Sequence, residues 1–230
     1  MLLHLKNILS KDEVQQARGL LEDTAPWIDG RSSAGGQAVN QKQNLQLSQD
    51  SEQSRQLQAL VLQALQKEPL FFSATLPKKI FNPLFNRYRG NSNFYGSHID
   101  GAVLHSRSPA QWVRSDISCT LFLSDPSEYD GGELVFQQAP DERRIKLSAG
   151  DLIIYPGSTL HQVMPVTRGE RIASFFWVES MVRSTEHRQL LFDMDMALLK
   201  LRSNASAPSD PALTQLTGTY HNLLRLWADT

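Results

Sequence analysis

The feature of this sequence that most restricts its fold is a change of hydrophobic period near residue 80. From there to about residue 180, short runs rich in β-branched and aromatic residues follow one another, as is typical of strands. Turn sequences such as Asp130-Gly131-Gly132 and Arg168-Gly169 separate the runs. No helical pattern interrupts them, so an antiparallel sandwich or jelly roll is favoured over parallel β–α–β winding. The predicted strands are 84–88, 116–123, 133–136, 151–155 and 171–178.

Helical patterns precede this β region. Ser10 and Glu13 have the spacing of a capping box, which predicts a helix over about residues 10–24. A second helix is predicted over about residues 50–67, where apolar side chains recur with helical spacing until Pro69. The chain is therefore expected to be α+β, with a mainly β core over about residues 80–180.

The C-terminal part returns to a helical period. An apolar stripe runs from about residue 184 to Leu201, and Asp210-Pro211 supplies an N-cap and a first-turn proline for another helix. We expect a C-terminal helical hairpin that docks its apolar face on the sheet or on another subunit. The predicted division is a domain over residues 1–182 and a helical extension over 183–230, and the apolar tail favours a homo-oligomer.

Charge and composition argue against several classes of function. The chain has 23 basic and 24 acidic residues and a net charge of −1, so no positive field is available to bind nucleic acid or an anionic membrane. No apolar run approaches the ~18 residues of a membrane span, and the N-terminus lacks the pattern of a signal peptide. The single cysteine, Cys119, cannot form an internal disulfide and indicates a reducing compartment. We expect a cytoplasmic protein with no nucleic-acid or membrane partner.

Two histidines and an aspartate are candidate metal ligands. His98 and Asp100 are two residues apart in a predicted strand, so their side chains face the same way. They supply two thirds of a facial triad, the arrangement that leaves three positions open on Fe(II). His161, which follows the strand 151–155, is the candidate third ligand. Taken alone, a histidine in this position is more often a core or surface residue.

Arg171 indicates a second ligand of the same site. It begins a predicted strand and shares a face with Phe175 and Trp177, which look interior. A guanidinium on an interior face is costly without an anion, and a dicarboxylate would satisfy it with bidentate hydrogen bonds. The alternative is that Arg171 lies at a solvated rim or pairs with Glu133 or Asp116.

The order and spacing of these residues resemble a known family. The chain resembles the bacterial PKHD-type hydroxylases, a branch of the prolyl 4-hydroxylase-like Fe(II)/2-oxoglutarate dioxygenases, over nearly its whole length. The motifs that carry the resemblance are Tyr95-Gly96-Ser97-His98-Ile99-Asp100, Tyr129-Asp130-Gly131-Gly132-Glu133-Leu134, Gly150-Asp151-Leu152-Ile153-Ile154-Tyr155-Pro156, Leu160-His161-Gln162-Val163, Thr167-Arg168-Gly169-Glu170-Arg171 and Trp177-Val178-Glu179-Ser180.

The resemblance implies a double-stranded β-helix (jelly-roll) core and a complete cofactor set. Fe(II) would be held by His98, Asp100 and His161, and 2-oxoglutarate by Arg171, with these four residues as the catalytic set. O₂ would be a cosubstrate, and L-ascorbate a supporting reductant. The family often has Asn after the metal-binding Asp; this chain has Gly101 there, which puts the shape of the substrate rim in doubt.

The expected reaction couples oxidative decarboxylation of 2-oxoglutarate to succinate with hydroxylation of an unknown protein, peptide or small molecule, with a link to iron uptake. Tyr88 and Tyr155 are candidates for hydrogen bonds to 2-oxoglutarate, or else aromatic core residues. Residues 102–115 are expected to form a loop that acts as a substrate lid, with His105 at its rim. The alternative function is a cupin-like metal-binding enzyme or sensor that does not use 2-oxoglutarate.

Overall fold

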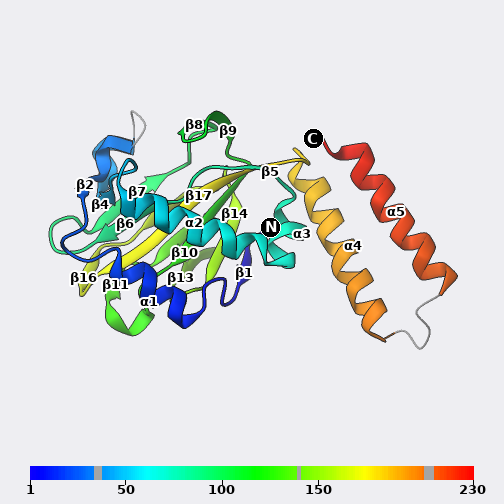
Figure 1. Ribbon diagram of the computed structural model, residues 1–230, viewed down its shortest axis with the longest axis horizontal. Helices are drawn as coiled ribbons and strands as arrows, with labels where there is room; N and C mark the ends of the chain where they lie inside the picture. The colour runs from blue at the N-terminus through cyan, green and yellow to red at the C-terminus, as the bar shows by residue number, and fades with distance from the viewer. Residues whose placement is uncertain (34–37, 139–140, 205–209) are drawn as a thin grey trace.

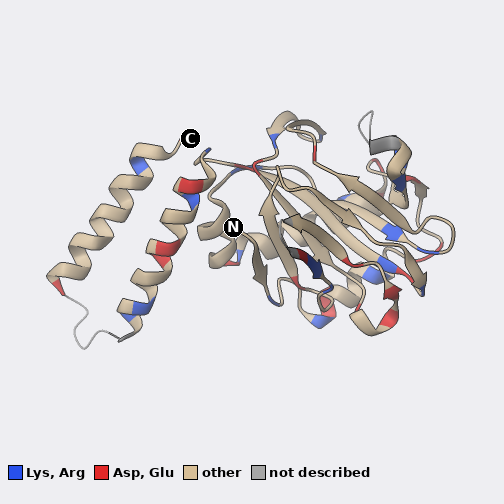
Figure 2. Cartoon of the chain, turned by 180° about the vertical axis from the view of Figure 1, so that it is seen from behind, with Lys and Arg blue, Asp and Glu red and all other residues tan. Residues whose placement is uncertain are grey.

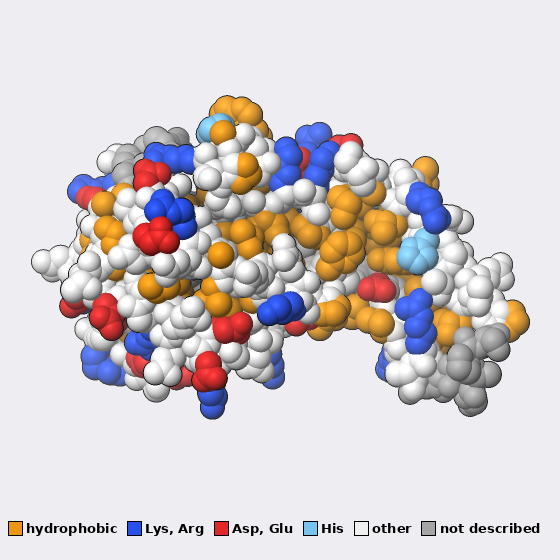
Figure 3. Space-filling model, in the orientation of Figure 1, with side chains coloured by type: hydrophobic (Ala, Val, Ile, Leu, Met, Phe, Trp, Pro, Cys, Tyr) orange, Lys and Arg blue, Asp and Glu red, His pale blue; other side chains and the backbone are white. Residues whose placement is uncertain are grey.

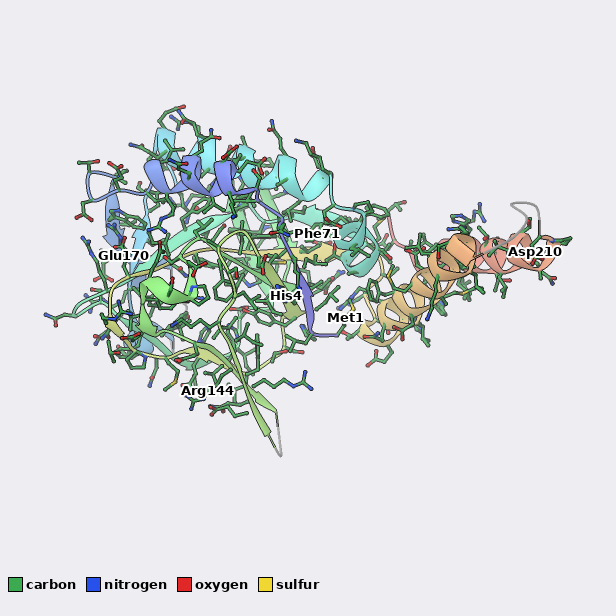
Figure 4. All side chains as sticks on the ribbon, turned by 90° about the horizontal axis from the view of Figure 1, so that it is seen from below. Met1, His4, Phe71, Arg144, Glu170 and Asp210 are labelled. Carbon is green, nitrogen blue, oxygen red and sulfur yellow. The ribbon has the colours of Figure 1, made fainter. Side chains whose placement is uncertain are left out.

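The computed structural model describes residues 1–33, 38–138, 141–204 and 210–230. Two antiparallel sheets form the body of the molecule, helices cover one outer face, and a helical hairpin projects from one end (Figure 1). Seen from below, the helices, the sheets and the projecting tail separate clearly (Figure 4). The predicted α+β jelly roll with N-terminal helices and a C-terminal helical pair is confirmed.

The larger sheet has eight strands, and its longest strand, β17, lies at the centre. All of its pairings are antiparallel, and β5 adds to the end of β17. The five predicted strands are present, but the sheet also recruits short strands from the N-terminal region that were not predicted. In order the strands are β1 (Leu3–Leu5), β14 (Leu152–Pro156), β10 (Ile117–Phe122), β17 (Arg171–Ser180), β6 (Leu84–Tyr88), β4 (Leu45–Leu47) and β2 (Trp27–Asp29), with β5 (Pro77–Ile80) off this path.

The smaller sheet faces the inner side of the larger one. A shared apolar cluster joins the two inner faces, with Phe122 and Ile153 from the larger sheet against Leu134 and Phe136 from the smaller one. A short pair of strands, β11 (Asp130–Gly131) and β16 (Val166–Arg168), lies beside it. In order the strands of the smaller sheet are β13 (Asp141–Ile145), β12 (Leu134–Gln138), β15 (His161–Val163), β7 (Phe94–His98) and β3 (Lys42–Gln43).

Helices cover the outer face of the larger sheet. α1 (Lys11–Gly19) begins with the predicted capping box: the Glu13 N–H donates to the Ser10 hydroxyl, and the Ser10 N–H donates to the Glu13 carboxylate. It ends earlier than the predicted residue 24. α2 (Glu52–Gln66) lies where a helix was predicted and packs on the strands through Leu57 and Val61.

A third helix, α3 (Pro69–Thr75), was not predicted. Pro69 does end the pattern of α2, but it also stands in the first turn of α3, where a missing N–H costs nothing. Glu68 caps this helix by accepting a hydrogen bond from the N–H of Leu70. The breaker of one helix is therefore the start of the next.

Residues 102–115 are not the loop that the sequence predicted. They form a two-stranded hairpin, β8 (Val103–Arg107) and β9 (Ala110–Arg114). Its inner side chains Leu104 and Val113 pack in a small apolar cluster with Phe81 and Leu84 of the larger sheet. These two apolar residues are separated by a polar stretch, so the alternation in the sequence is too weak to identify the strands.

The tail forms the predicted helical hairpin, α4 (Thr185–Asn204) and α5 (Pro211–Trp227). It packs on α3 and the end of β17 rather than on the face of the sheet, through a cluster that includes Leu76, Val182 and Leu198. The Ser73 hydroxyl of α3 donates to Asp195 of α4 at 2.5 Å. Within the described ranges, no helix has the length and apolar character needed to cross a membrane.

Candidate active site

A cavity of about 520 Å³ opens between the two sheets. Strands β6, β10, β14 and β17 form one wall, and β7 and β15 form the other. Charged residues are sparse along the strands that form the body of the molecule (Figure 2), so the charged side chains inside this cavity stand out. His98, Asp100, His161 and Arg171, all predicted as site residues, line this cavity, as do Tyr88 and Tyr155.

The two candidate histidine ligands are cross-strand neighbours. His98 ends β7, His161 begins β15, and the two are register partners. The register then shifts, so that Val163 pairs with Tyr95, which leaves one extra residue on β7. This bulge allows Tyr95 and His98 to face the cavity together, with their rings stacked 3.6 Å apart.

Hydrogen bonds fix both imidazoles in the form that can bind a metal. The Nδ1 atom of His98 lies 2.8 Å from the carbonyl oxygen of Gly96, and that of His161 lies 2.9 Å from the carbonyl oxygen of Thr159. A carbonyl can only accept, so each Nδ1 carries the hydrogen and each Nε2 presents a lone pair. Burial, reinforced by the neighbouring His161, lowers the pKa of His98 to about 4, which keeps it neutral.

Asp100 completes the group from beyond the strand. The sequence analysis placed it on the strand with His98, but β7 ends at His98 and Asp100 lies two residues further along. The alternation nevertheless continues, since Ile99 is exposed and Asp100 turns inward. The Oδ1 atom of Asp100 is 3.9 Å from Nε2 of His98 and 4.0 Å from Nε2 of His161, while its Oδ2 accepts from the Ser118 hydroxyl at 2.5 Å. Two imidazoles and one carboxylate directed at one point fit a ferrous ion.

Arg171 lies buried at another part of the same cavity. It is 1% exposed, pairs in register with Tyr88, and has the rings of Tyr88 and Phe122 at 5.3 and 5.1 Å from its guanidinium carbon. None of its three guanidinium nitrogens has a hydrogen-bond partner within the described residues. The alternative of a solvated rim is therefore wrong, and Asp116, the suggested partner, binds Arg114 instead. An isolated buried cation of this kind fits an anionic ligand.

The two tyrosines predicted as candidates also face the cavity. The Tyr88 hydroxyl lies 3.4 Å from the amide nitrogen of Asn86, and Tyr155 contacts the His161 ring edge-on at 5.1 Å between centroids. Burial raises the pKa of both phenols, so both are neutral and can donate a hydrogen bond. His105, by contrast, lies on the β8–β9 hairpin against Trp112 and does not line the cavity.

Sequence reasoning missed several cavity residues. Ser118 was treated only as part of a strand, although its hydroxyl holds Asp100. Lys42 is only 3% exposed, pairs in register with Tyr95, and lies beside the rings of Tyr95 and Phe175. Burial lowers the pKa of Lys42 to about 8, against the opposing effect of Asp100. Its local sequence is polar and gives no sign of burial, so only the folded chain identifies it.

Two family models match the chain. Residues 83–179 match the 2OG-Fe(II) oxygenase superfamily, and residues 186–229 match the PKHD-type hydroxylase C-terminal domain. With the jelly roll and the His-Asp-His group, these matches define a 2OG-Fe(II) oxygenase, a class of enzymes that uses Fe(II), 2-oxoglutarate and O₂.

The curated relatives identify the branch of this class. The chain is 55% identical to a PKHD-type hydroxylase of Variovorax paradoxus (strain S110) over 100% of both chains, and 54% identical to one of a Polaromonas species over 100% of both. The chain therefore belongs to the PKHD-type hydroxylase family.

Solved structures support the fold. A prolyl hydroxylase from Trichoplax adhaerens, in complex with a hypoxia inducible factor peptide fragment, matches with a TM-score of 0.55 at 16% identity, covering 83% of this chain and 86% of that one. The carbocyclase SnoK from nogalamycin biosynthesis matches with a TM-score of 0.56 at 15% identity, covering 82% and 85%.

Proposed function

We propose that this enzyme hydroxylates its substrate with His98, Asp100 and His161 as ligands of Fe(II) and Arg171 as the anchor of the distal carboxylate of 2-oxoglutarate. The observation that carries the proposal is the buried guanidinium of Arg171, which has no hydrogen-bond partner in the described part of the chain and lines the same cavity as the His-Asp-His group. A cation and a metal group in one cavity suit a ligand that has a carboxylate at one end and a chelating 2-oxo acid at the other.

The bound iron supplies the oxygen chemistry, in which decarboxylation of 2-oxoglutarate to succinate and CO₂ is coupled to hydroxylation of the substrate. The protein supplies position. The carbonyl groups of Gly96 and Thr159 orient the imidazoles, and the Ser118 hydroxyl orients the carboxylate of Asp100. We assign Tyr88 and Tyr155 as hydrogen-bond donors to 2-oxoglutarate, supported by their neutral hydroxyls in the cavity wall. The apolar walls exclude water from the reacting atoms.

The substrate is proposed to approach past the β8–β9 hairpin. Leu104 of this hairpin lines the cavity together with Ile99, Gly101 and Leu160. The small Gly101 leaves space where a longer side chain would stand, since an added Cβ would lie 3.1 Å from Leu104. A protein, a peptide and a small molecule are all candidate substrates, and a role in iron uptake remains a proposal based on the family resemblance.

Other parts of the proposal rest on composition and on the resemblance. We propose ascorbate as the supporting reductant and the cytoplasm as the compartment, the latter because the single cysteine is buried and cannot pair within the chain. We also propose residues 1–182 as the oxygenase domain and residues 183–230 as an extension that contributes to a homo-oligomer.

The test is succinate formation from 2-oxoglutarate under air, with added Fe(II) and ascorbate. Wild type is expected to form succinate slowly without its substrate, and His161→Ala and Arg171→Ala are expected to lose this activity. His221→Ala and Arg225→Ala, both exposed on α5, are the matched controls and are expected to retain it. An anaerobic titration of the iron-loaded wild type with 2-oxoglutarate completes the test. If no binding occurs, the proposal is wrong, and the cupin-like enzyme or sensor without 2-oxoglutarate takes its place.

A further inference from the structure

A buried tyrosine outside the predicted set lies beside Arg171. Tyr129 follows the short helix η3 (Pro126–Glu128) and precedes β11, and it is fully buried. Its hydroxyl has no hydrogen-bond partner within the described residues. Arg171 is near enough for its charge to oppose the effect of burial, which raises the pKa of Tyr129. The phenol and the guanidinium are therefore neighbours.

The surrounding chain holds the ring of Tyr129 in place. The Lys146 ammonium donates to the carbonyl oxygen of Tyr129 at 2.6 Å and lies 3.9 Å from the centroid of its ring. Gly132 has a φ of +68°, and a Cβ at this position would lie 2.9 Å from the same ring. A Cβ on Gly169 would lie 3.1 Å from the Cα of Tyr129. The two glycine turns thus let the backbone pack closely around Tyr129, which fixes the direction of its hydroxyl.

Adjacent buried donors without an acceptor point to a shared ligand. All three guanidinium nitrogens of Arg171 and the phenol oxygen of Tyr129 are buried and lack a partner in the described ranges. Leaving such groups unsatisfied is costly, so native structures normally pair them with protein, water or ligand. A guanidinium can only donate, and a neutral phenol donates readily to an anion. The missing group is therefore an acceptor with more than one lone pair, and a carboxylate meets this requirement.

We propose that Tyr129 is a cosubstrate-binding residue whose hydroxyl donates to the same distal carboxylate of 2-oxoglutarate that Arg171 binds. This inference rests on the proposed function. It assigns to the Asp130-Gly131-Gly132 turn a role beyond chain reversal, because the turn packs against the ring that presents the hydroxyl. It also gives the site a second means of selecting a dicarboxylate, since a 2-oxo acid with a terminal methyl group would leave both donors unsatisfied.

The test compares Tyr129→Phe with wild type in binding two 2-oxo acids of the same chain length. Anaerobic calorimetry on the iron-loaded protein measures the dissociation constants of 2-oxoglutarate and of 2-oxovalerate, which has a methyl group in place of the distal carboxylate. Tyr129→Phe is expected to bind 2-oxoglutarate roughly 10- to 100-fold more weakly, because a hydrogen bond to a charged acceptor is lost, with no change for 2-oxovalerate. Tyr220→Phe, a buried tyrosine in the tail cluster, is the matched control and is expected to behave as wild type.

Unchanged 2-oxoglutarate affinity in Tyr129→Phe would overturn the inference and leave the proposed function intact. Equal weakening for both acids would also overturn it, because that pattern indicates a merely structural role. Failure of the wild type to bind 2-oxoglutarate would instead remove the proposed function itself.

A second measurement applies if Tyr129→Phe does not fold. The wild-type chain, labelled with 3-fluorotyrosine, has five tyrosine ¹⁹F signals, and those of the other four tyrosines are assigned by substitution with Phe. The remaining signal, from Tyr129, is expected to shift on addition of 2-oxoglutarate but not of 2-oxovalerate. An equal response to both acids, or none, contradicts the inference.

Discussion

At the scale of single residues, the site depends on groups that hold the proposed ligands rather than on the ligands alone. Backbone carbonyls hold the Nδ1 atoms of His98 and His161, and one hydroxyl, from Ser118, holds Asp100. Such supporting hydrogen bonds restrict the ligand side chains to the orientation that binds, so less entropy is lost when the metal enters.

Removing the hydroxyl of Ser118 tests this support. Ser118→Ala is expected to weaken Fe(II) binding by roughly 10-fold, within the range seen when a partner of a metal ligand is removed. Anaerobic metal titration measures the effect. Ser174→Ala is the matched control, because Ser174 is equally buried on the neighbouring strand but its hydroxyl has no hydrogen-bond partner in the described chain. Equal metal affinity in the wild type and both variants would contradict the prediction.

Lys42 should make the stability of the metal-free protein depend on pH. Its pKa falls from 10.5 to about 8 on folding, so between these values the unfolded chain binds more protons and stability rises with pH. Below about pH 8 both states are charged and the full cost of burying the ammonium is present. Lys42→Met is therefore expected to be more stable than wild type at pH 7, by up to about 3 kcal/mol, and the difference should shrink towards pH 10.5. Urea unfolding at several pH values measures this, and a constant difference across the range would refute it.

At the scale of elements, irregularities in the strands determine which side chains reach the cavity. The bulge between β7 and β15 turns Tyr95 and His98 to the same side, which a regular strand would not do for residues three apart. The glycine turn at 131–132 has the left-handed backbone that glycine tolerates and other residues adopt only with strain.

Substituting a glycine of this turn tests its role. Gly132→Ala is expected to destabilise the protein by about 1–3 kcal/mol, because a left-handed φ is costly for alanine and the new Cβ would approach the ring of Tyr129. Gly218→Ala is the matched control: Gly218 lies within α5 with no atom near its Cβ position, and alanine there should stabilise the helix by about 0.5–1 kcal/mol. Chemical denaturation measures both, and the prediction fails if the two changes have the same sign.

At the scale of the whole molecule, the tail hairpin leaves an apolar surface between itself and the body. Hydrophobic side chains gather in the hollow between the sheets and the two tail helices (Figure 3). Among the exposed apolar residues of these elements are Leu70 and Phe72 of α3 and Leu190 of α4. Exposed apolar patches of this kind are typical of interfaces.

The proposed homo-oligomer can be tested on this surface. Sedimentation of the wild type is expected to give a multiple of the 25.9 kDa chain mass, and Leu190→Asp is expected to shift the protein towards the monomer because a charge would be buried in the interface. Lys200→Asp, on the same helix and exposed, serves as a control for the new charge. A wild type that sediments as a monomer at all concentrations would refute the proposal.

The sequence by itself determined the jelly-roll class, the helices before and after it, and the types of residue in the site. Period-two alternation, the capping box of Ser10 and the guanidinium of Arg171 on an apolar face are local patterns, and local patterns survive in a sequence without structure. The tertiary structure alone decided the rest. It placed His161 opposite His98, carried the hydroxyl of Ser118 to Asp100, buried Lys42 from a polar segment and set Tyr129 beside Arg171. The physical reason is that these contacts join segments far apart in the chain, and neither strand register nor the packing of two sheets is written in the neighbours of any one residue.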